Sequence, residues 1–113
     1  MIILDKPIKK NELNDMATKM FGDMVKGVVD VEQGKLALDA ELHADLEALF
    51  LENGSKQEFL WGINLYPEED GEDFLEFDSL INIRPRQNNR GRGVYDEKIR
   101  LQISDIVTRW INE

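Results

Sequence analysis

The order of hydrophobic patterns along the chain constrains its fold more than any other feature. Apolar residues recur at helical spacing near each end, over residues 10–21 and 96–111, whereas patterns typical of strands fill the middle. Helices and strands do not alternate as they would in a parallel sheet. We therefore predict an α+β fold, in which an antiparallel sheet of about four to five strands carries an N-terminal and a C-terminal helix on one face.

The two predicted helices have recognisable ends. Asn11 is the expected N-cap of the first helix, Gly22 its end, and Asp96 the N-cap of the last helix. The apolar face of the first helix consists of Leu13, Met16, Ala17 and Met20. The apolar face of the last helix consists of Ile99, Ile103, Ile106, Val107, Trp110 and Ile111. Both helices should therefore pack one face against the sheet.

Between the helices, the chain predicts a hairpin and two further strands. Residues 24–31 are rich in Val and are followed by Gln33 and Gly34, a turn, and then by the apolar residues 36–38. Residues 60–66 form the next expected strand, closed by Pro67. Residues 74–84 alternate well enough to pair back as another strand.

Residues 38–53 carry two conflicting patterns. Apolar and polar residues alternate without a break from Leu38 to Ala48, as in a half-buried strand, and Asn53-Gly54 would supply the hairpin turn after it. The same segment is rich in the helix formers Ala, Leu and Glu, and its leucines also fit a helical stripe. We favour a strand here, and a helix ending at Gly54 is the alternative.

Size and composition indicate one domain, residues 1–113, of the reducing cytoplasm. A chain of 113 residues is long enough for one core. It has no cysteine, which excludes disulfides and thiolate zinc sites. The first residues lack the apolar run of a signal peptide, and no stretch of 18 apolar residues occurs. We therefore expect a cytoplasmic protein with no membrane association.

Charge is strongly segregated along the chain. The net charge is −9, which favours basic partners or simple solubility and makes nucleic acid an unlikely partner. Residues 68–76 contain six acids and no base, whereas residues 84–92 contain four arginines and no acid. We call residues 84–93 the Arg/Asn/Gly loop. Its guanidinium groups could grip a phosphate or carboxylate, although they could also simply neutralise the acidic segment.

The candidate ligand-binding residues come from this loop and from three isolated polar positions. In the loop they are Arg84, Arg86, Asn89, Arg90 and Arg92. Asn64 and Asn82 each stand between apolar residues, so they either satisfy buried backbone or face a polar pocket.

His43 is the only histidine and lies in a run of acids at 39, 41, 45 and 47. Such a set could bind a cation or transfer protons, but a solvated strand face explains it better, because ligands in a straight row diverge. We expect no metal and no cofactor.

Three blocks of sequence resemble a known family. They are residues 41–45 (ELHAD), residues 54–67 (GSKQEFLWGINLYP) and residues 79–85 (SLINIRP) continuing to Asn89-Arg90. With these blocks the chain resembles the small prokaryotic domain of unknown function numbered 5674. The resemblance spans most of the chain, and it implies neither an activity nor catalytic residues.

These observations favour a non-catalytic binding or regulatory module that engages a protein partner or an anionic ligand through the Arg/Asn/Gly loop. A first alternative is an enzyme acting on a phosphorylated or otherwise anionic small molecule, with Arg84, Arg86 and Arg90 binding it and His43 or an acid transferring protons. A second alternative is nucleic-acid binding through the same loop. In each case the site is expected where the loop meets the sheet.

Overall fold

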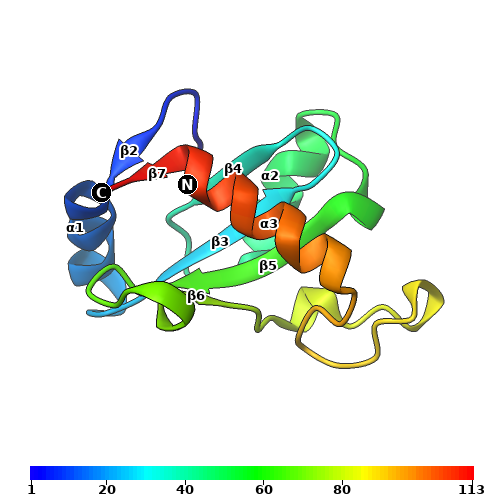
Figure 1. The fold of residues 1–113 in the computed structure, drawn as a ribbon. Helices are drawn as coiled ribbons and strands as arrows, with labels where there is room; N and C mark the ends of the chain where they lie inside the picture. Colours follow the sequence, from blue (N-terminus) through cyan, green and yellow to red (C-terminus); the bar gives the residue numbers. More distant parts are fainter.

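A five-stranded antiparallel sheet forms the centre of the protein (Figure 1). The structure is a computed structural model that describes all residues 1–113. The strands lie in the order β1-β4-β3-β5-β6. Their bounds are Ile2–Ile3 for β1, Val25–Asp30 for β3, Lys35–Leu38 for β4, Leu60–Leu65 for β5 and Leu75–Glu76 for β6. Two further short strands, β2 (Ile8–Lys9) and β7 (Ile111–Asn112), pair in parallel.

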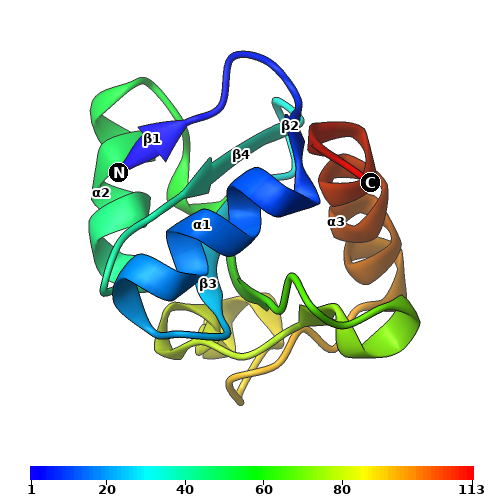
Figure 2. The same ribbon diagram turned by 90° about the vertical axis from the view of Figure 1, so that its left-hand side faces the viewer.

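Three α-helices cover the two faces of this sheet. They are α1 (Lys10–Met20), α2 (His43–Glu52) and α3 (Glu97–Trp110). Figure 2 shows α2 and α3 on opposite sides of the sheet. The buried residues of α1 belong to the same apolar cluster as those of α3, so α1 packs on the side of α3. The apolar core is divided accordingly, with sixteen buried residues on the side of α1 and α3 and six on the side of α2. The predicted α+β class, with the first and last helices on one face, is therefore confirmed.

The ends of the outer helices follow local rules, with one exception. Gly22 adopts φ +94° just after α1, and its amide donates to the carbonyl of Ala17. The side chain of Asp96 accepts a hydrogen bond from the Lys98 amide at 2.8 Å, as predicted for an N-cap. The prediction for Asn11 is wrong, because α1 already begins at Lys10 and no side chain caps it.

The prediction of a strand over residues 38–53 is also wrong. The strand β4 ends at Leu38, and α2 begins at His43. Helical spacing decides which residues are buried: the buried side chains of α2 are His43, Leu46 and Phe50, whereas Leu42 is 56% exposed. Burial of Leu46 and Phe50 on the second face of the sheet therefore outweighs the alternating pattern. The helix ends before Gly54, which has φ +92°, as the alternative predicted.

The predicted strand over residues 74–84 is confirmed only at its start. Pairing with β5 stops after Glu76, and the chain then forms two short 3₁₀ segments, Leu80–Asn82 and Pro85–Gln87. The segment Leu80–Asn82 begins at Ser79, whose hydroxyl accepts a hydrogen bond from the Ile81 amide. Two more 3₁₀ segments lie earlier in the chain: Gly71–Asp73 precedes β6, and Gln57–Phe59 precedes β5.

Asn82 replaces the missing partner strand beside β5. Its amide oxygen accepts from the Gly62 amide at 2.8 Å, and its amide nitrogen donates to the Gly62 carbonyl at 2.9 Å. One side chain thus satisfies both backbone groups of an edge residue, which is why the sheet needs no further strand there. A Cβ atom on Gly62 would lie 2.6 Å from Ser79 Oγ, so this close approach requires glycine.

Candidate functional site

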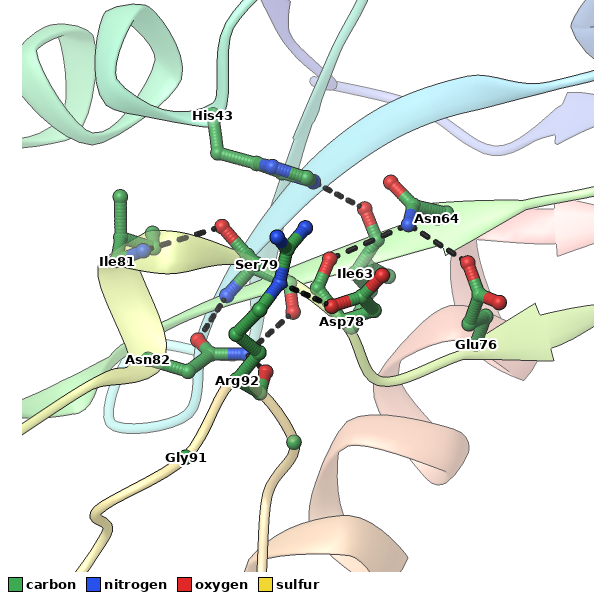
Figure 3. Close-up of polar contacts among 12 residues, drawn as sticks. His43, Ile63, Asn64, Glu76, Asp78, Ser79, Ile81, Asn82, Gly91 and Arg92 are labelled. Carbon is green, nitrogen blue, oxygen red and sulfur yellow. Dashed lines mark hydrogen bonds and ion pairs between the residues drawn. The ribbon is translucent and has the colours of Figure 1, made fainter.

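A cavity of about 440 Å³ lies where the start of α2, the open end of the sheet and the Arg/Asn/Gly loop meet. Its polar lining comes from β3, β5, α2, β6 with the residues that follow it, and the loop. Figure 3 shows the members from α2, β5, β6 and the loop. The polar side chains are those of Lys26, His43, Asn64, Tyr66, Glu76, Asp78, Ser79 and Arg92. This volume falls within the range of about 300–1,000 Å³ that is usual for small-molecule sites.

Three of these residues form a row across the sheet. In the strand register, Lys26 of β3 lies opposite Asn64 of β5, and Asn64 lies opposite Glu76 of β6. Directly opposite residues of an antiparallel sheet project from the same face. The sheet therefore presents a cation, an amide and a carboxylate side by side beneath the start of α2.

Asn64 is the most deeply buried member of this row. It is 6% exposed, and its amide nitrogen donates to Glu76 Oε1 at 2.8 Å and to the Asp78 carbonyl at 3.2 Å. Two acceptors on one side fix the orientation of the amide. Its oxygen, Asn64 Oδ1, is buried and accepts no hydrogen bond. Such an atom lowers stability by roughly 1–3 kcal/mol, so a ligand N–H group placed here would be favoured.

His43 lies at the first position of α2, above the row. Its Nε2 lies 2.8 Å from the Ile63 carbonyl, to which it must donate, so a neutral ring carries no proton on Nδ1. Burial lowers the pKa of His43, and the positive charge of Lys26 lowers this pKa further. The hydrogen bond to Ile63 and the nearby Asn64 amide act against these effects, although Asn64 Oδ1 makes no hydrogen bond. The ring is therefore neutral at pH 7.

Arg92 brings the end of the Arg/Asn/Gly loop to the cavity. Its Nε donates to Asp78 Oδ1 at 2.7 Å, and Figure 3 shows the guanidinium group pointing into the space between Asp78 and His43. The two terminal nitrogens make no hydrogen bond within the protein. Lys26 makes no ion pair, since the chain has only the pairs Lys10–Asp70 and Arg92–Asp78. The ammonium group of Lys26 lies 5.1 Å from the centre of the Phe21 ring, a contact that uses none of its N–H donors. Lys26 and the terminal nitrogens of Arg92 thus have no anionic partner that uses these donors.

Tyr66 also lines the cavity. Its hydroxyl donates to Glu76 Oε1 at 3.0 Å. Burial and the carboxylate of Glu76 raise the pKa of Tyr66 to about 12, so the hydroxyl keeps its proton. Glu76 Oε1 therefore receives two hydrogen bonds, from Asn64 and Tyr66, and Glu76 Oε2 receives none from the protein.

Arg84 lies away from the cavity and is occupied by other contacts. Its two terminal nitrogens donate to the carbonyls of Gln57 at 2.5 Å and Leu60 at 2.6 Å, and its guanidinium lies 4.0 Å from the centre of the Trp61 ring. Burial lowers the pKa of Arg84, and the negative charge of Glu47 partly opposes this shift. These contacts join the loop to the start of β5 and leave neither terminal nitrogen of Arg84 free for a ligand.

The two buried asparagines of this region organise the loop. Asn82 also donates to the Arg92 carbonyl at 2.9 Å. Asn89 donates to the carbonyls of Asn82 and Gly93, each at 2.7 Å, and accepts from the Tyr95 amide at 3.0 Å. Both amides are used within the protein, so they position Arg92 and do not line the cavity.

The structure therefore separates the eight predicted residues into two groups. His43, Asn64 and Arg92 meet in the cavity. Asn82, Arg84, Arg86, Asn89 and Arg90 lie outside it, with Arg86 and Arg90 exposed on the loop. The sequence reasoning missed Lys26 and Glu76, which reach the cavity only through the strand register. A signal for Lys26 existed, because it is the one lysine inside the Val-rich strand.

The structure contains neither a cluster of metal ligands nor a helix that could cross a membrane. No group of three or more histidine, aspartate and glutamate side chains could hold a metal ion. None of the helices has both the length and the apolar character that a membrane crossing requires.

Comparison with known proteins places the chain in a family. It matches no curated protein and no solved structure. A family described as "Protein of unknown function (DUF5674)" matches residues 2–110. The match covers nearly the whole chain and includes the three blocks on which the resemblance was based. The protein belongs to this family of unknown function.

Proposed function

We propose that this protein is a non-catalytic binding module that takes a small anionic ligand in the cavity where the Arg/Asn/Gly loop meets the sheet. One observation carries the proposal: Lys26, which has no ion pair, and the free terminal nitrogens of Arg92 converge on one cavity of about 440 Å³. A planar guanidinium with two free nitrogens suits a carboxylate or phosphate, and Lys26 adds a second charge.

The hydrogen bonds that hold Arg92 support binding by a preformed site. Asp78 holds Nε, and Asn82 holds the backbone carbonyl of Arg92. A side chain held in this way loses little conformational entropy when a ligand binds. The loop thus contributes one oriented arginine to the ligand, and its other polar residues support that arginine.

Anion titrations followed by NMR test this proposal. Acetate, butyrate and inorganic phosphate are added to ¹⁵N-labelled protein while the Arg92 Nε–H signal and the backbone amides of β3 and β5 are recorded. We expect saturable shifts around the cavity with at least one anion. We expect Lys26→Gln and Arg92→Gln each to weaken binding by about tenfold, which corresponds to about 1.4 kcal/mol.

Arg86→Gln is the matched control, because Arg86 belongs to the same loop and lies outside the cavity. It should bind the same anion as the natural chain does. Loss of binding in Arg86→Gln, with normal binding in Arg92→Gln, would place the anion at the exposed part of the loop and reject the cavity.

An enzyme acting on an anionic small molecule is the second candidate. The presence of neutral His43 in the same cavity as Arg92 supports it, because a neutral imidazole can accept a proton from a bound substrate. Arg84 is removed from this mechanism by its contacts with Trp61 and the carbonyls of Gln57 and Leu60. An enzyme would convert the bound compound during prolonged incubation, whereas a binding module would return it unchanged.

A further inference from the structure

We infer that the ligand also carries a primary ammonium group, so that the cavity takes a small zwitterion with its anion at Lys26 and Arg92 and its amine at Asn64 and Glu76. This inference rests on the proposed function for the anionic end of the ligand. It adds the second end, and it assigns roles to two residues of the cavity that anion binding does not use.

The unpartnered oxygen of Asn64 is the first observation. This side chain is 6% exposed, and its nitrogen is committed to Glu76 and Asp78. Figure 3 shows the oxygen on the opposite side of the amide from Glu76. Because Oδ1 can only accept, an anion placed here would meet a lone pair, whereas an N–H group would satisfy it.

The carboxylate of Glu76 is the second observation. It has no cationic partner, and its hydrogen bonds with Asn64 and Tyr66 leave Oε2 free. With a pKa of about 12, Tyr66 stays protonated and holds this carboxylate in place. An ammonium group has three N–H donors, enough to reach both Glu76 Oε2 and Asn64 Oδ1.

The strand register separates the two charges of the site. Lys26 and Glu76 lie on β3 and β6, with β5 between them, so their backbones are two strand spacings or roughly 10 Å apart. Asn64 stands between them in the same row. A simple anion would leave Glu76 Oε2 and Asn64 Oδ1 without donors, and the positive charge of a simple amine would lie near Lys26. A compound with opposite charges at its two ends complements the whole row.

A matched series of four-carbon compounds tests the inference: butyrate, 4-aminobutyrate, 4-(trimethylammonio)butyrate and butylamine. The trimethylated compound keeps the positive charge and removes every N–H donor. We expect 4-aminobutyrate to bind about tenfold more tightly than the other three. The same comparison with glycine and 6-aminohexanoate, each against its acid and its trimethylated form, covers shorter and longer spacings.

Variants locate the amine. In Asn64→Leu and Glu76→Gln, the advantage of the amino acid over butyrate, measured within each variant, should fall to about threefold or less. Glu68→Gln, which removes an exposed acid outside the cavity, should keep the full advantage. Thermal melting of each variant identifies any that fails to fold. Glu76 is an exposed residue of the short strand β6, so Glu76→Gln tests the inference even if Asn64→Leu does not fold.

The outcomes separate the two proposals. If butyrate, its amino form and its trimethylated form bind equally at every length, the inference of an amine is overturned and the anion site stands. Equal binding of 4-aminobutyrate by Glu76→Gln, Asn64→Leu and the natural chain would also overturn the inference. If no anion and no zwitterion binds, the proposed function itself is rejected.

Discussion

The two ends of the Arg/Asn/Gly loop contain the same residue in two different settings. At the first end, Arg84 is half-buried, lies against Trp61 and donates to two backbone carbonyls. At the other end, Arg92 is exposed, makes one ion pair with Asp78 and points its terminal nitrogens into the cavity. Both residues are positively charged, but only Arg92 has terminal nitrogens that are free to bind an anion.

The comparison shows that the availability of an arginine depends on its acceptors and not on the charge of its segment. The backbone carbonyls of residues 57 and 60 accept hydrogen bonds from both terminal nitrogens of Arg84, so this side chain stabilises the fold and is not available to a ligand. Asp78 uses only Nε of Arg92. Arg84 therefore marks the anchored end of the loop and Arg92 the open end.

Removing Asn82 should have the largest effect, because its amide connects β5 to the open end. Asn82→Ala deletes three hydrogen bonds and leaves both backbone groups of Gly62 without partners. We expect the free energy of unfolding to fall by about 3 kcal/mol. Urea denaturation measures this loss. Asn53→Ala removes one exposed hydrogen bond to Leu49 and is the control; equal losses in the two variants would mean that Asn82 does not hold the sheet edge.

The anchored end should depend on the shape of Arg84 as well as its charge. Arg84→Ala loses two charge-assisted hydrogen bonds and the contact with Trp61, so we expect a loss of about 2 kcal/mol. Arg84→Lys should recover less than half of it, because an ammonium group cannot replace the planar fork. Urea unfolding followed by tryptophan fluorescence measures both. Full recovery with lysine would show that charge alone matters at this position.

The cavity should make stability depend on pH through His43. Its pKa is lowered in the folded state, so between pH 7 and pH 5.5 the unfolded chain binds more protons than the folded one. Stability is therefore lost as the pH falls below about 6.5, with a slope of at most about 1.4 kcal/mol per pH unit. His43 is the only histidine, so His43→Gln should remove this slope from urea unfolding data. An unchanged slope in the variant would exclude His43 as its source.

The smallest effect on stability is expected at the open end. The ion pair of Arg92 with Asp78 is exposed on both sides, and exposed pairs contribute about 0–1 kcal/mol. Arg92→Ala should therefore change the free energy of unfolding by less than about 0.5 kcal/mol, while it weakens anion binding. Urea denaturation tests the first statement. A loss as large as that of Arg84→Ala would remove the distinction between the two ends.

Sequence reasoning located the outer helices, the hairpin and the loop, since each depends on local patterns. It failed for residues 38–53, where alternation and helix propensity conflict and only the second face of the sheet decides. That face receives Leu46 and Phe50, and nothing local to the segment shows that a second layer exists. The alternation misled because Leu42 and Ala44, which it would bury, are exposed.

The candidate site was predictable only in part, for a similar reason. His43, Asn64 and Arg92 are unusual enough in their own segments to be noticed. Lys26 and Glu76 join them because the register of β3, β5 and β6 aligns residues far apart in the chain. Arg84 looked available because the sequence does not show the carbonyls of residues 57 and 60 beside it.

The most direct test of the central claim follows the Nε–H signals of Arg84 and Arg92 in one titration with 4-aminobutyrate. Binding in the cavity predicts a saturable shift of the Arg92 signal and a constant Arg84 signal, with the Asn64 side-chain amide moving along with Arg92. A constant Arg92 signal, or a shift confined to residues outside the cavity, would contradict the account.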